Sequence, residues 1–363
     1  MAEFTSWNLA ADNVPAAVSL AGHIALRCDT VRHDEERAPA TMKSEQTVVQ
    51  AARALQGGAL VAFPTETVYG LGADATNPAA VARIYAAKGR PSSHPLIVHL
   101  ASAEDLSHWA VDPPAEALLL AATFWPGPLT IVVGSPRGLA AAVTGGRATV
   151  GLRVPDHPMA LELIRLAGVP IAAPSANRFG RVSPTTAAHV RAELGNAVDV
   201  VLDGGPCRVG VESTIIEILP GGTVLLRPGG VTVDAIEAVL GRAIERIAPG
   251  PARASGMLPS HYAPAAEVEM LDAGALKARA AEHTSIGRRV GVLALTVEPP
   301  RGTLSLGHPR SVEELAHGLY GHLRAADEAG VDVVLIEAPA ADGLGLAILD
   351  RVGKAAAPRP SAE

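Results

Sequence analysis

The sequence predicts an α/β protein built of two domains, and three observations lead to this fold class. Short apolar runs typical of buried strands alternate with segments of helical periodicity along most of the chain. Residues 248–265, rich in proline, glycine and serine, interrupt this alternation as a linker would. The chain has 363 residues, which is long enough for a hydrophobic core on each side of the linker. We therefore expect a twisted mixed sheet before the linker and a smaller Rossmann-like α/β domain after it.

The first domain is expected over residues 44–247. Ser44 is a good N-cap for the helix that opens it. Asn77 and Pro78 start a second helix, because a capping side chain is followed by proline at the first helical position. Strands are expected near residues 59–63, 95–100, 129–133, 149–154, 169–173, 198–202, 212–218 and 223–227. Helices are expected near residues 45–56, 78–88, 114–124, 157–167, 185–194 and 233–241.

The second domain is expected over residues 266–357, followed by a tail of residues 358–363. Residues 290–295 and 331–338 predict buried strands, and residues 311–329 have helical periodicity after a serine cap. A last helix is expected around residues 344–354. Since no GxGxxG motif is present, the sequence does not support a dinucleotide site.

Composition and charge exclude several classes of protein. Charges and prolines interrupt every apolar run well before the ~20 residues that a membrane-spanning helix needs. The first residues lack the basic region and apolar core of a secretory signal, so a cytoplasmic location is expected. The two cysteines, Cys28 and Cys207, have no spacing that indicates a zinc site or a disulfide framework. A net charge of −7 argues against broad, charge-driven binding of nucleic acid.

The most informative stretch reads AFPTETVYGLGADA over residues 62–75 and KGRPSSHPLIVH over residues 88–99. Its candidate site residues, on loops around two strands, are Thr65, Tyr69, Lys88, Arg90 and His99. Alternate residues of an extended segment project the same way, so Lys88 and Arg90 are expected to converge on one anion. Taken alone, the two cations would fit a solvated helix C-terminus better than a binding site. The neighbouring threonine and tyrosine favour a binding site.

Further candidates stand at other strand ends. Arg153 ends a predicted strand, where its guanidinium can hold a carboxylate with two parallel hydrogen bonds. Ser175 and Asn177 stand in a strand-to-helix loop whose polar groups can cradle phosphate oxygens. Structural alternatives stay open: a salt bridge for Arg153, helix capping for the loop, and a turn in which the Thr65 side chain bonds its own backbone.

The order of these motifs makes the chain similar to the YrdC-like family, whose signature is Lys-x-Arg followed far downstream by Ser-x-Asn. The chain has Lys88-Gly89-Arg90 and Ser175-Ala176-Asn177. Other matching motifs are FWPGPLT (residues 124–130), GLRVPDHP (151–158), GVESTIIE (210–217) and LRPGG (226–230). SGMLPSHYAP, residues 255–264, resembles the linker of two-domain threonylcarbamoyl-AMP synthases. The similarity covers roughly residues 44–357 and implies an open YrdC-like sheet with a large concave face.

Residues 1–43 match nothing in that family, and two interpretations are open. Either translation begins at Met42, or the residues before it form a genuine flexible extension. The intact mass of the protein from its native host distinguishes the two.

The resemblance implies an enzyme that joins L-threonine, bicarbonate and ATP into threonylcarbamoyl-AMP and pyrophosphate. It implies transient partner proteins that pass the product to the adenosine beside the anticodon in tRNA. The catalytic residues that it implies are Lys88 and Arg90. The threonine-binding residues are Thr65, Tyr69, His99, Arg153, Ala173 and Ser213. The ATP-binding residues are Arg90, His94, Thr149, Ser175, Asn177, Ser183, Arg227 and Tyr262. His94 stands where the family often has a short amide, although an imidazole can also donate a hydrogen bond to phosphate.

This reaction needs no covalent nucleophile, and the sequence has no nucleophile elbow, Cys/His pair or HExxH motif. We expect positioning and charge neutralisation instead. Magnesium is expected with ATP, held largely by phosphate oxygens and water, so no protein metal ligand is predicted. In the resembling enzymes the linker folds over the site, so Tyr262 is expected to close over ATP and exclude water. An inert tether is the alternative.

Two other functions stay open. The same domain occurs in carbamoyltransferases of hydrogenase maturation, but those carry further domains with zinc-binding cysteines that this chain lacks. A non-enzymatic RNA-binding module would need a clustered basic face, which the acidic balance disfavours.

Overall fold

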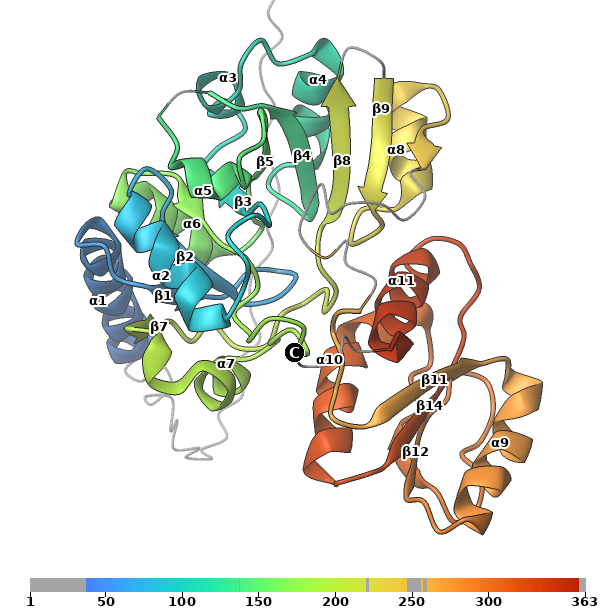
Figure 1. The fold of residues 1–363 in the computed structure, drawn as a ribbon. Coiled ribbons are helices and arrows are strands. Elements are labelled where there is room, and N and C mark those ends of the chain that lie inside the picture. The colour runs from blue at the N-terminus through green and yellow to red at the C-terminus, as the bar shows by residue number, and fades with distance from the viewer. Residues whose placement is uncertain (1–36, 137, 220–221, 247–255, 257–259, 359–363) are drawn as a thin grey trace, which may run out of the picture. The chain divides into compact units, whose positions relative to one another are not determined.

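The computed structural model describes residues 37–136, 138–219, 222–246, 256 and 260–358, and it has the two-domain α/β fold expected from the sequence (Figure 1). A mixed sheet belongs to the first domain and a separate parallel sheet to the C-terminal domain. Most of the linker expected at 248–265, and nearly all of the N-terminal extension, lie outside the described residues. The expected domain boundaries therefore stay predictions.

The first domain is organised by one sheet of ten strands. In chain order they are β1 (Val61–Phe63), β2 (Gly70–Asp74), β3 (Ile97–His99), β4 (Leu129–Gly134), β5 (Thr149–Arg153), β6 (Ile171–Ala172), β7 (Val200–Val201), β8 (Thr214–Leu219), β9 (Gly222–Arg227) and β10 (Glu245–Arg246). Their order across the sheet is β10-β9-β8-β4-β5-β3-β6-β2-β1-β7. The sheet is mixed, since β3 runs parallel to β5 and antiparallel to β6.

The sequence does not predict β2, because its segment GLGAD contains two glycines, which are depleted in strands. In the structure β2 lies between β1 and β6 and pairs antiparallel with both. A Cβ at Gly72 would lie 2.8 Å from side-chain atoms of Ile171 and Phe63. The glycine therefore lets these two side chains pack against the strand backbone. The short edge strand β10 is also missing from the prediction.

The helices of the first domain agree with the sequence analysis except for their ends and three short elements. They are α1 (Arg37–Gln56), α2 (Pro78–Lys88), α3 (Leu106–Trp109), α4 (Ala115–Phe124), α5 (Ala141–Thr144), α6 (Pro158–Ala167), α7 (Ala187–Leu194), the 3-10 helix η1 (Gly195–Ala197) and α8 (Val233–Leu240). The Asn77 side chain caps α2 as expected, accepting hydrogen bonds from the backbone of Ala79 and Ala80. The predicted N-cap at Ser44 is wrong, because α1 begins at Arg37. Its early residues are mainly good helix formers, and Pro39 falls in the first turn, where proline is tolerated.

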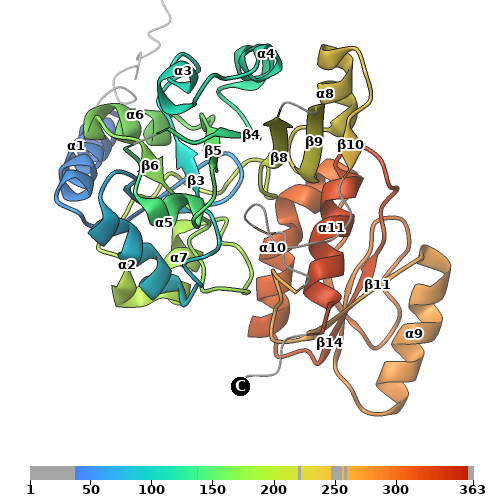
Figure 2. The same ribbon diagram turned by 45° about the horizontal axis from the view of Figure 1, so that its top comes forward.

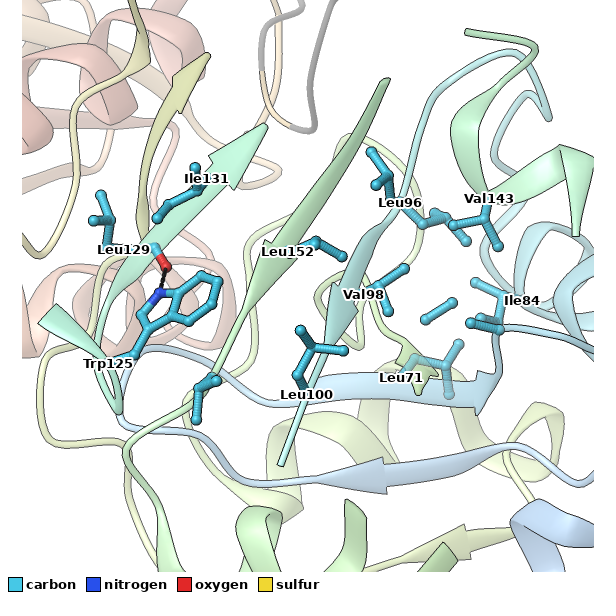
Figure 3. Close-up of a cluster of buried hydrophobic side chains, with 14 of the residues drawn as sticks. Leu71, Ile84, Leu96, Val98, Leu100, Trp125, Leu129, Ile131, Val143 and Leu152 are labelled. Atoms are coloured by element: carbon cyan, nitrogen blue, oxygen red, sulfur yellow. Dashed lines mark hydrogen bonds between the residues drawn. The ribbon is translucent and has the colours of Figure 1, made fainter. Parts of the chain in front are cut away.

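The two faces of this sheet are covered differently. On one face, Val98 of β3, Leu152 of β5 and Ile131 of β4 pack with helices α2 and α4 into the largest hydrophobic core. Figure 3 shows part of this core, including the Trp125 indole, whose Nε1 donates to the Leu129 carbonyl at 2.7 Å. On the other face, α1 and α6 pack against β1 and β6. Among the described residues, no comparable helical core covers β3 and β5 on that second face, and the candidate site described below lies there.

The C-terminal domain is a four-stranded parallel sheet between helices. Its strands are β11 (Glu267–Leu271), β12 (Val290–Leu293), β13 (Leu304–Gly307) and β14 (Val333–Glu337), in the order β11-β14-β12-β13. Its helices are α9 (Ala273–Ser285), α10 (Val312–Glu328) and α11 (Gly345–Ala356). α9 packs on one face, while α10 and α11 pack on the other (Figure 2). The serine cap is confirmed, because Ser311 Oγ accepts the Glu314 N–H at 3.2 Å. The sequence analysis did not predict β11, α9 or β13.

In the part of the chain that the structure describes, no helix has both the length and the apolar character needed to cross a bilayer.

Candidate functional site

A cavity lies over β3 and β5, on the face of the sheet opposite to the largest core. In the parallel pairing of these strands, His99 stands opposite Arg153 and Ile97 opposite Gly151. Alternate strand residues project to one face, so His99 and Arg153 point away from the side that holds Val98. The cavity contains about 520 Å³ of empty space, counted with its open mouth.

Nine of the residues expected from the sequence line this cavity together. They are Thr65, Arg90, His99, Arg153, Ala173, Ser175, Ser213, Arg227 and Tyr262. Arg153 and Arg227 are the last residues of β5 and β9. Ser213, in contrast, precedes β8. In a mixed sheet the start of one strand lies beside the end of an antiparallel neighbour, so both kinds of end meet at the cavity.

Arg153 is held from behind by a buried carboxylate. Its Nη2 donates to Glu66 Oε1 at 2.7 Å and to Thr67 Oγ1 at 3.0 Å, and its Nε donates to the Gly127 carbonyl at 3.3 Å. Glu66 is itself fixed, because its Oε2 accepts the Asp156 N–H at 3.0 Å. The two side chains of this ion pair are only 5% and 1% exposed. Glu66 thus sets the orientation of the guanidinium at the cavity wall.

The Thr65 hydroxyl forms the local turn that was left open as an alternative. It donates to the Val68 carbonyl at 2.6 Å and accepts the Thr67 and Val68 N–H groups at 3.2 Å each. Its side chain nevertheless lines the cavity. Turn formation and exposure to the cavity therefore coexist at this residue.

Ser213 and Arg227 form one unit of the cavity wall. Arg227 donates to the Ser213 carbonyl from Nη2 at 2.8 Å and from Nε at 3.1 Å. Its Nη2 also donates to Ser213 Oγ at 3.1 Å, and that hydroxyl lies 2.8 Å from Thr130 Oγ1. A displacement of Ser213 therefore also displaces the guanidinium of Arg227.

His99 is a neutral imidazole in this setting. Burial, and then the charge of Arg153, lower its pKa to about 3. Its Nδ1 is buried and has no hydrogen-bond partner among the described residues. An imidazole with such a pKa is a weak proton acceptor, so the structure favours a hydrogen-bonding role over removal of an amine proton.

Lys88 and Arg90 lie close together but face different groups. The Lys88 ammonium donates to the Ser175 carbonyl at 2.6 Å and to the Asn177 carbonyl. Burial, followed by the charge of Arg90, holds the pKa of Lys88 well below its usual range. The Arg90 guanidinium lines the cavity and lies 5.8 Å from the centre of the Phe179 ring. Lys88 thus fixes the loop of Ser175 and Asn177 from behind, whereas Arg90 reaches the cavity itself.

Several expected residues stand outside the cavity lining: Tyr69, Lys88, His94, Thr149, Asn177 and Ser183. The Tyr69 hydroxyl donates to the Gly205 carbonyl at 2.8 Å, and burial raises its pKa to about 12. Asn177 Nδ2 donates to the carbonyls of Arg178 and Arg181 at 2.8 Å each. These two side chains therefore support loops of the site in the structure.

His94, Thr149 and Ser183 also stand outside the cavity lining. The His94 ring packs at 5.5 Å from the Phe179 ring, and burial lowers its pKa. Thr149 is the first residue of β5, at the opposite end from Arg153. Ser183 Oγ donates to Glu212 Oε1 at 2.7 Å. Residues outside the lining can still contact a ligand that extends beyond the cavity.

The described end of the linker covers the cavity. Tyr262 and His261 line it, and their rings lie 4.1 Å apart. Tyr262 is 1% exposed and adopts a positive φ of 63°, a conformation that non-glycine residues rarely adopt. A Cβ at Gly256 would lie 2.3 Å from the Tyr262 hydroxyl and 3.0 Å from Arg227 Nη1. The linker backbone at Gly256 therefore packs directly against the cavity wall.

Sequence reasoning missed two carboxylates, Glu66 and Glu212, and the supporting hydroxyl of Thr67. Both acids are nearly fully buried, at 1% and 5% exposure. Each stands in a motif that was recognised, PTET and VEST, where an acid between apolar or hydroxyl residues indicates burial with a partner. The partners themselves are distant in sequence and give no local signal.

The chemistry of the cavity is that of cations and hydroxyls. Burial raises the pKa of the nearby Cys207 thiol to about 12, so it is unsuited as a nucleophile. Among the described residues, no group of three or more histidine, cysteine, aspartate or glutamate side chains is arranged to hold a metal ion. Arg90, Arg153 and Arg227 instead offer three guanidinium groups to a ligand. The fold and the site therefore define an α/β protein with a cavity whose chemistry suits anionic small molecules.

Comparison with known proteins gives the family. Residues 53–229 match the family described as Telomere recombination, and residues 231–357 match that described as Threonylcarbamoyl-AMP synthase, C-terminal domain. Threonylcarbamoyl-AMP synthase of Pyrococcus abyssi is 45% identical over 84% of this chain and 92% of its own length. The Bacillus subtilis protein of the same name is 44% identical over 87% of this chain and 94% of its own length. The chain belongs to the threonylcarbamoyl-AMP synthase family.

Solved structures agree with this assignment. The crystal structure of P. abyssi Sua5 complexed with L-threonine is 44% identical to this chain, with a TM-score of 0.81. The match covers 86% of this chain and 94% of that one. The likeness thus includes both domains.

Proposed function

We propose that this protein is an L-threonylcarbamoyladenylate synthase, a nucleotidyltransferase that condenses L-threonine, bicarbonate and ATP into threonylcarbamoyl-AMP and pyrophosphate. The observation that carries the proposal is the cavity, in which one guanidinium suits a carboxylate and two suit phosphates. This cavity stands in a chain that matches named synthases over more than nine tenths of their length.

L-Threonine is proposed to bind at the Glu66–Arg153 side. The Arg153 guanidinium would hold the substrate carboxylate. Glu66 orients this guanidinium through the hydrogen bond from Arg153 Nη2 to Glu66 Oε1 at 2.7 Å. Ser213, Thr65 and the neutral His99 would orient the amine and hydroxyl by hydrogen bonds. A pocket that packs the threonine methyl group gains only about 1–3 kcal/mol over serine, so some use of serine is expected.

The nucleotide is proposed to bind on the side of Arg90 and Arg227. Arg90 keeps its charge at neutral pH, since burial lowers its pKa only to about 10. Ser175 presents its loop to the phosphates, and Lys88 braces that loop through two carbonyls. Binding of a phosphate near Lys88 would favour its charged form, which burial disfavours in the free protein.

The reaction needs two bond-forming steps. The threonine amine attacks bicarbonate, which forms an N–C bond and releases water to give a carbamate. A carbamate oxygen then attacks the α-phosphorus of ATP as the bond to pyrophosphate breaks. The protein aligns the two reactants and neutralises the charge on the leaving pyrophosphate with Arg90 and Lys88.

Magnesium is proposed to arrive with ATP. The acidic side chain that lines the described cavity, Glu212, already accepts hydrogen bonds from Ser183, Tyr320 and Arg351. The donor set therefore fits a cation held by phosphate oxygens and water rather than by protein carboxylates. Bound in that way, magnesium would supply charge neutralisation on the phosphates.

The linker is proposed to act as a lid over ATP, and the product is proposed to pass to transfer proteins acting on tRNA. A substitution at Tyr262 tests whether the linker acts as a lid. If the Tyr262→Ala variant binds ATP and turns over like the wild type, the linker is an inert tether.

Pyrophosphate release from ATP with bicarbonate tests the function, with threonine, serine and no amino acid compared. Release that requires both threonine and bicarbonate is the expected result. Release without threonine would favour a carbamoyltransferase with another acceptor. No release from folded protein with magnesium present would favour the binding module, which salt-dependent tRNA binding without ATP consumption would then identify.

A further inference from the structure

A buried charge cluster joins the C-terminal domain to the cavity wall. Glu212 lines the cavity, and its Oε2 accepts hydrogen bonds from the Tyr320 hydroxyl at 2.8 Å and from Arg351 Nε at 2.6 Å. Tyr320 belongs to α10 and Arg351 to α11, and both side chains are almost fully buried. The third donor, Ser183, comes from the first domain and bonds Oε1.

Arg351 contacts the surroundings of three proposed ligand-binding residues. Its Nε holds Glu212, which precedes Ser213 in the chain. Its Nη2 donates at 3.0 Å to the carbonyl of Pro228, which follows Arg227. Its guanidinium carbon lies 5.3 Å from the centre of the Tyr262 ring. One side chain of the C-terminal domain thus contacts the chain neighbours of both Ser213 and Arg227, and also Tyr262.

The cluster is electrostatically strong enough to hold its geometry. Burial alone would raise the pKa of Glu212, but the charges of Arg351 and Arg227 and the bonds from Arg351 and Ser183 lower it to about 2. The carboxylate is therefore ionised at any physiological pH. In such a buried site, removing one donor leaves a charge that water cannot readily reach. The Tyr320 ring also stacks on Tyr262 at 5.7 Å, so lid and cluster are packed together.

We infer that Tyr320 and Arg351 are positioning residues: through Glu212 they hold Ser213 and Arg227 in the geometry that binds threonine and the nucleotide. This inference rests on the proposed function of the cavity. It assigns the C-terminal domain a part in forming the substrate site, in addition to supporting the lid. Neither residue contacts a substrate in this arrangement, because each acts through Glu212, Pro228 or Tyr262.

The test compares Tyr320→Phe and Arg351→Lys with the wild type. Tyr320→Phe removes one hydroxyl and keeps the ring that packs against Tyr262. Arg351→Lys keeps a positive charge for Glu212, but one ammonium cannot reproduce the guanidinium fork that also reaches Pro228. The matched control is Glu337→Gln, which alters a buried carboxylate of the same domain. Its partners Leu295, Thr296 and Val297 lie outside the cavity lining.

Four quantities are measured for each variant: the dissociation constant of L-threonine by calorimetry, kcat and KM for pyrophosphate release, and Tm. We expect Tyr320→Phe to weaken threonine binding and raise the KM of threonine roughly tenfold or more, because the variant loses one hydrogen bond to a charged group. Arg351→Lys should show the larger effect. Glu337→Gln should leave both constants at wild-type values even where its Tm falls.

Unchanged threonine affinity and KM in both cluster variants would overturn the inference. So would a loss confined to kcat that follows the fall in Tm, as in a merely structural role. Wild-type protein that releases no pyrophosphate would instead refute the proposed function. The calorimetric comparison still tests the positioning role in that case, because it does not depend on turnover.

Discussion

Removal of the Glu66 carboxylate would leave Arg153 as a buried cation without its ion partner. The side chains are 1% and 5% exposed, and their closest atoms are 2.7 Å apart. We expect Glu66→Ala to destabilise the protein strongly and to change its response to threonine. Glu66→Gln is the milder comparison, since its amide oxygen can still accept the Arg153 Nη2–H bond.

The size of the effect follows from the burial of the pair. Breaking a buried ion pair from one side costs about 3–5 kcal/mol. In a domain of about 200 residues, each 1 kcal/mol shifts Tm by about 2–4 °C, which gives a fall of roughly 6–20 °C for Glu66→Ala. The Asp156 N–H also loses its acceptor. Glu66→Gln keeps one acceptor oxygen for Arg153, but its amide nitrogen cannot accept the Asp156 N–H. It should still lose less stability than Glu66→Ala.

Threonine supplies the second part of the assay. Its carboxylate is the anion that Arg153 lacks in Glu66→Ala, so added L-threonine should raise the Tm of this variant more than that of the wild type. Differential scanning calorimetry with and without the amino acid measures both shifts, and L-alanine amide, which has no carboxylate, is the control ligand. A Tm within about 2 °C of the wild type would refute the reasoning on the ion pair. Equal stabilisation of variant and wild type by threonine would refute the assignment of Arg153 to its carboxylate.

Three further predictions concern other parts of the site. His99 and His261 have pKa values near 3 in the folded protein against 6.5 in the unfolded chain, so their contribution to the free energy of unfolding is full above pH 6.5 and is lost as the pH falls toward 3. Urea unfolding across this pH range should show the loss, and a flat profile would contradict the prediction. Gly210→Ala should lower Tm by several degrees, because φ is +82° and a Cβ would lie 2.4 Å from the His317 carbonyl oxygen. Lys88→Gln should lower kcat/KM for ATP by at least about tenfold, measured by pyrophosphate release, and a change in Tm alone would argue for a purely structural lysine.

The sequence predicted the fold where the local pattern and the final packing agree. α2 has its predicted bounds, because Asn77 caps it and Gly89 ends it with a φ of +62°. β2 was not predicted because its glycines are unusual in strands. Glycine is needed there because Phe63 and Ile171, from two other strands, pack closely against the backbone. The start of α1 was predicted too late because a local signal was present but misleading. Ser44 is a plausible cap, yet helix-forming residues before it let the helix continue toward the N-terminus.

The candidate site, like the fold, was predicted from the sequence only in part. Arg153 was predicted from its residue type at a strand end, whereas His99 and Arg227 were expected mainly from the family resemblance. The structure brings all three to one cavity. Tyr69 and Asn177 have equally suggestive types, but their polar groups bond to nearby backbone. Whether a polar side chain faces a ligand or a loop depends on a rotation of a few bonds. The pattern of residue types does not contain that information.

The groups that sequence cannot identify are those that hold the ligand-binding groups in place. Glu66 and Arg153 are 87 positions apart, and Glu212 and Arg351 are 139 apart, so neither pair shares a local motif. Each acid is nevertheless costly to bury without a cation, which means that its burial predicts a partner even where the partner is unknown. In this protein the two partners differ in origin: Arg153 lines the cavity of the first domain, and Arg351 belongs to the C-terminal domain. The same physical requirement therefore preorganises the Arg153 side within one domain and makes the Ser213–Arg227 side depend on two.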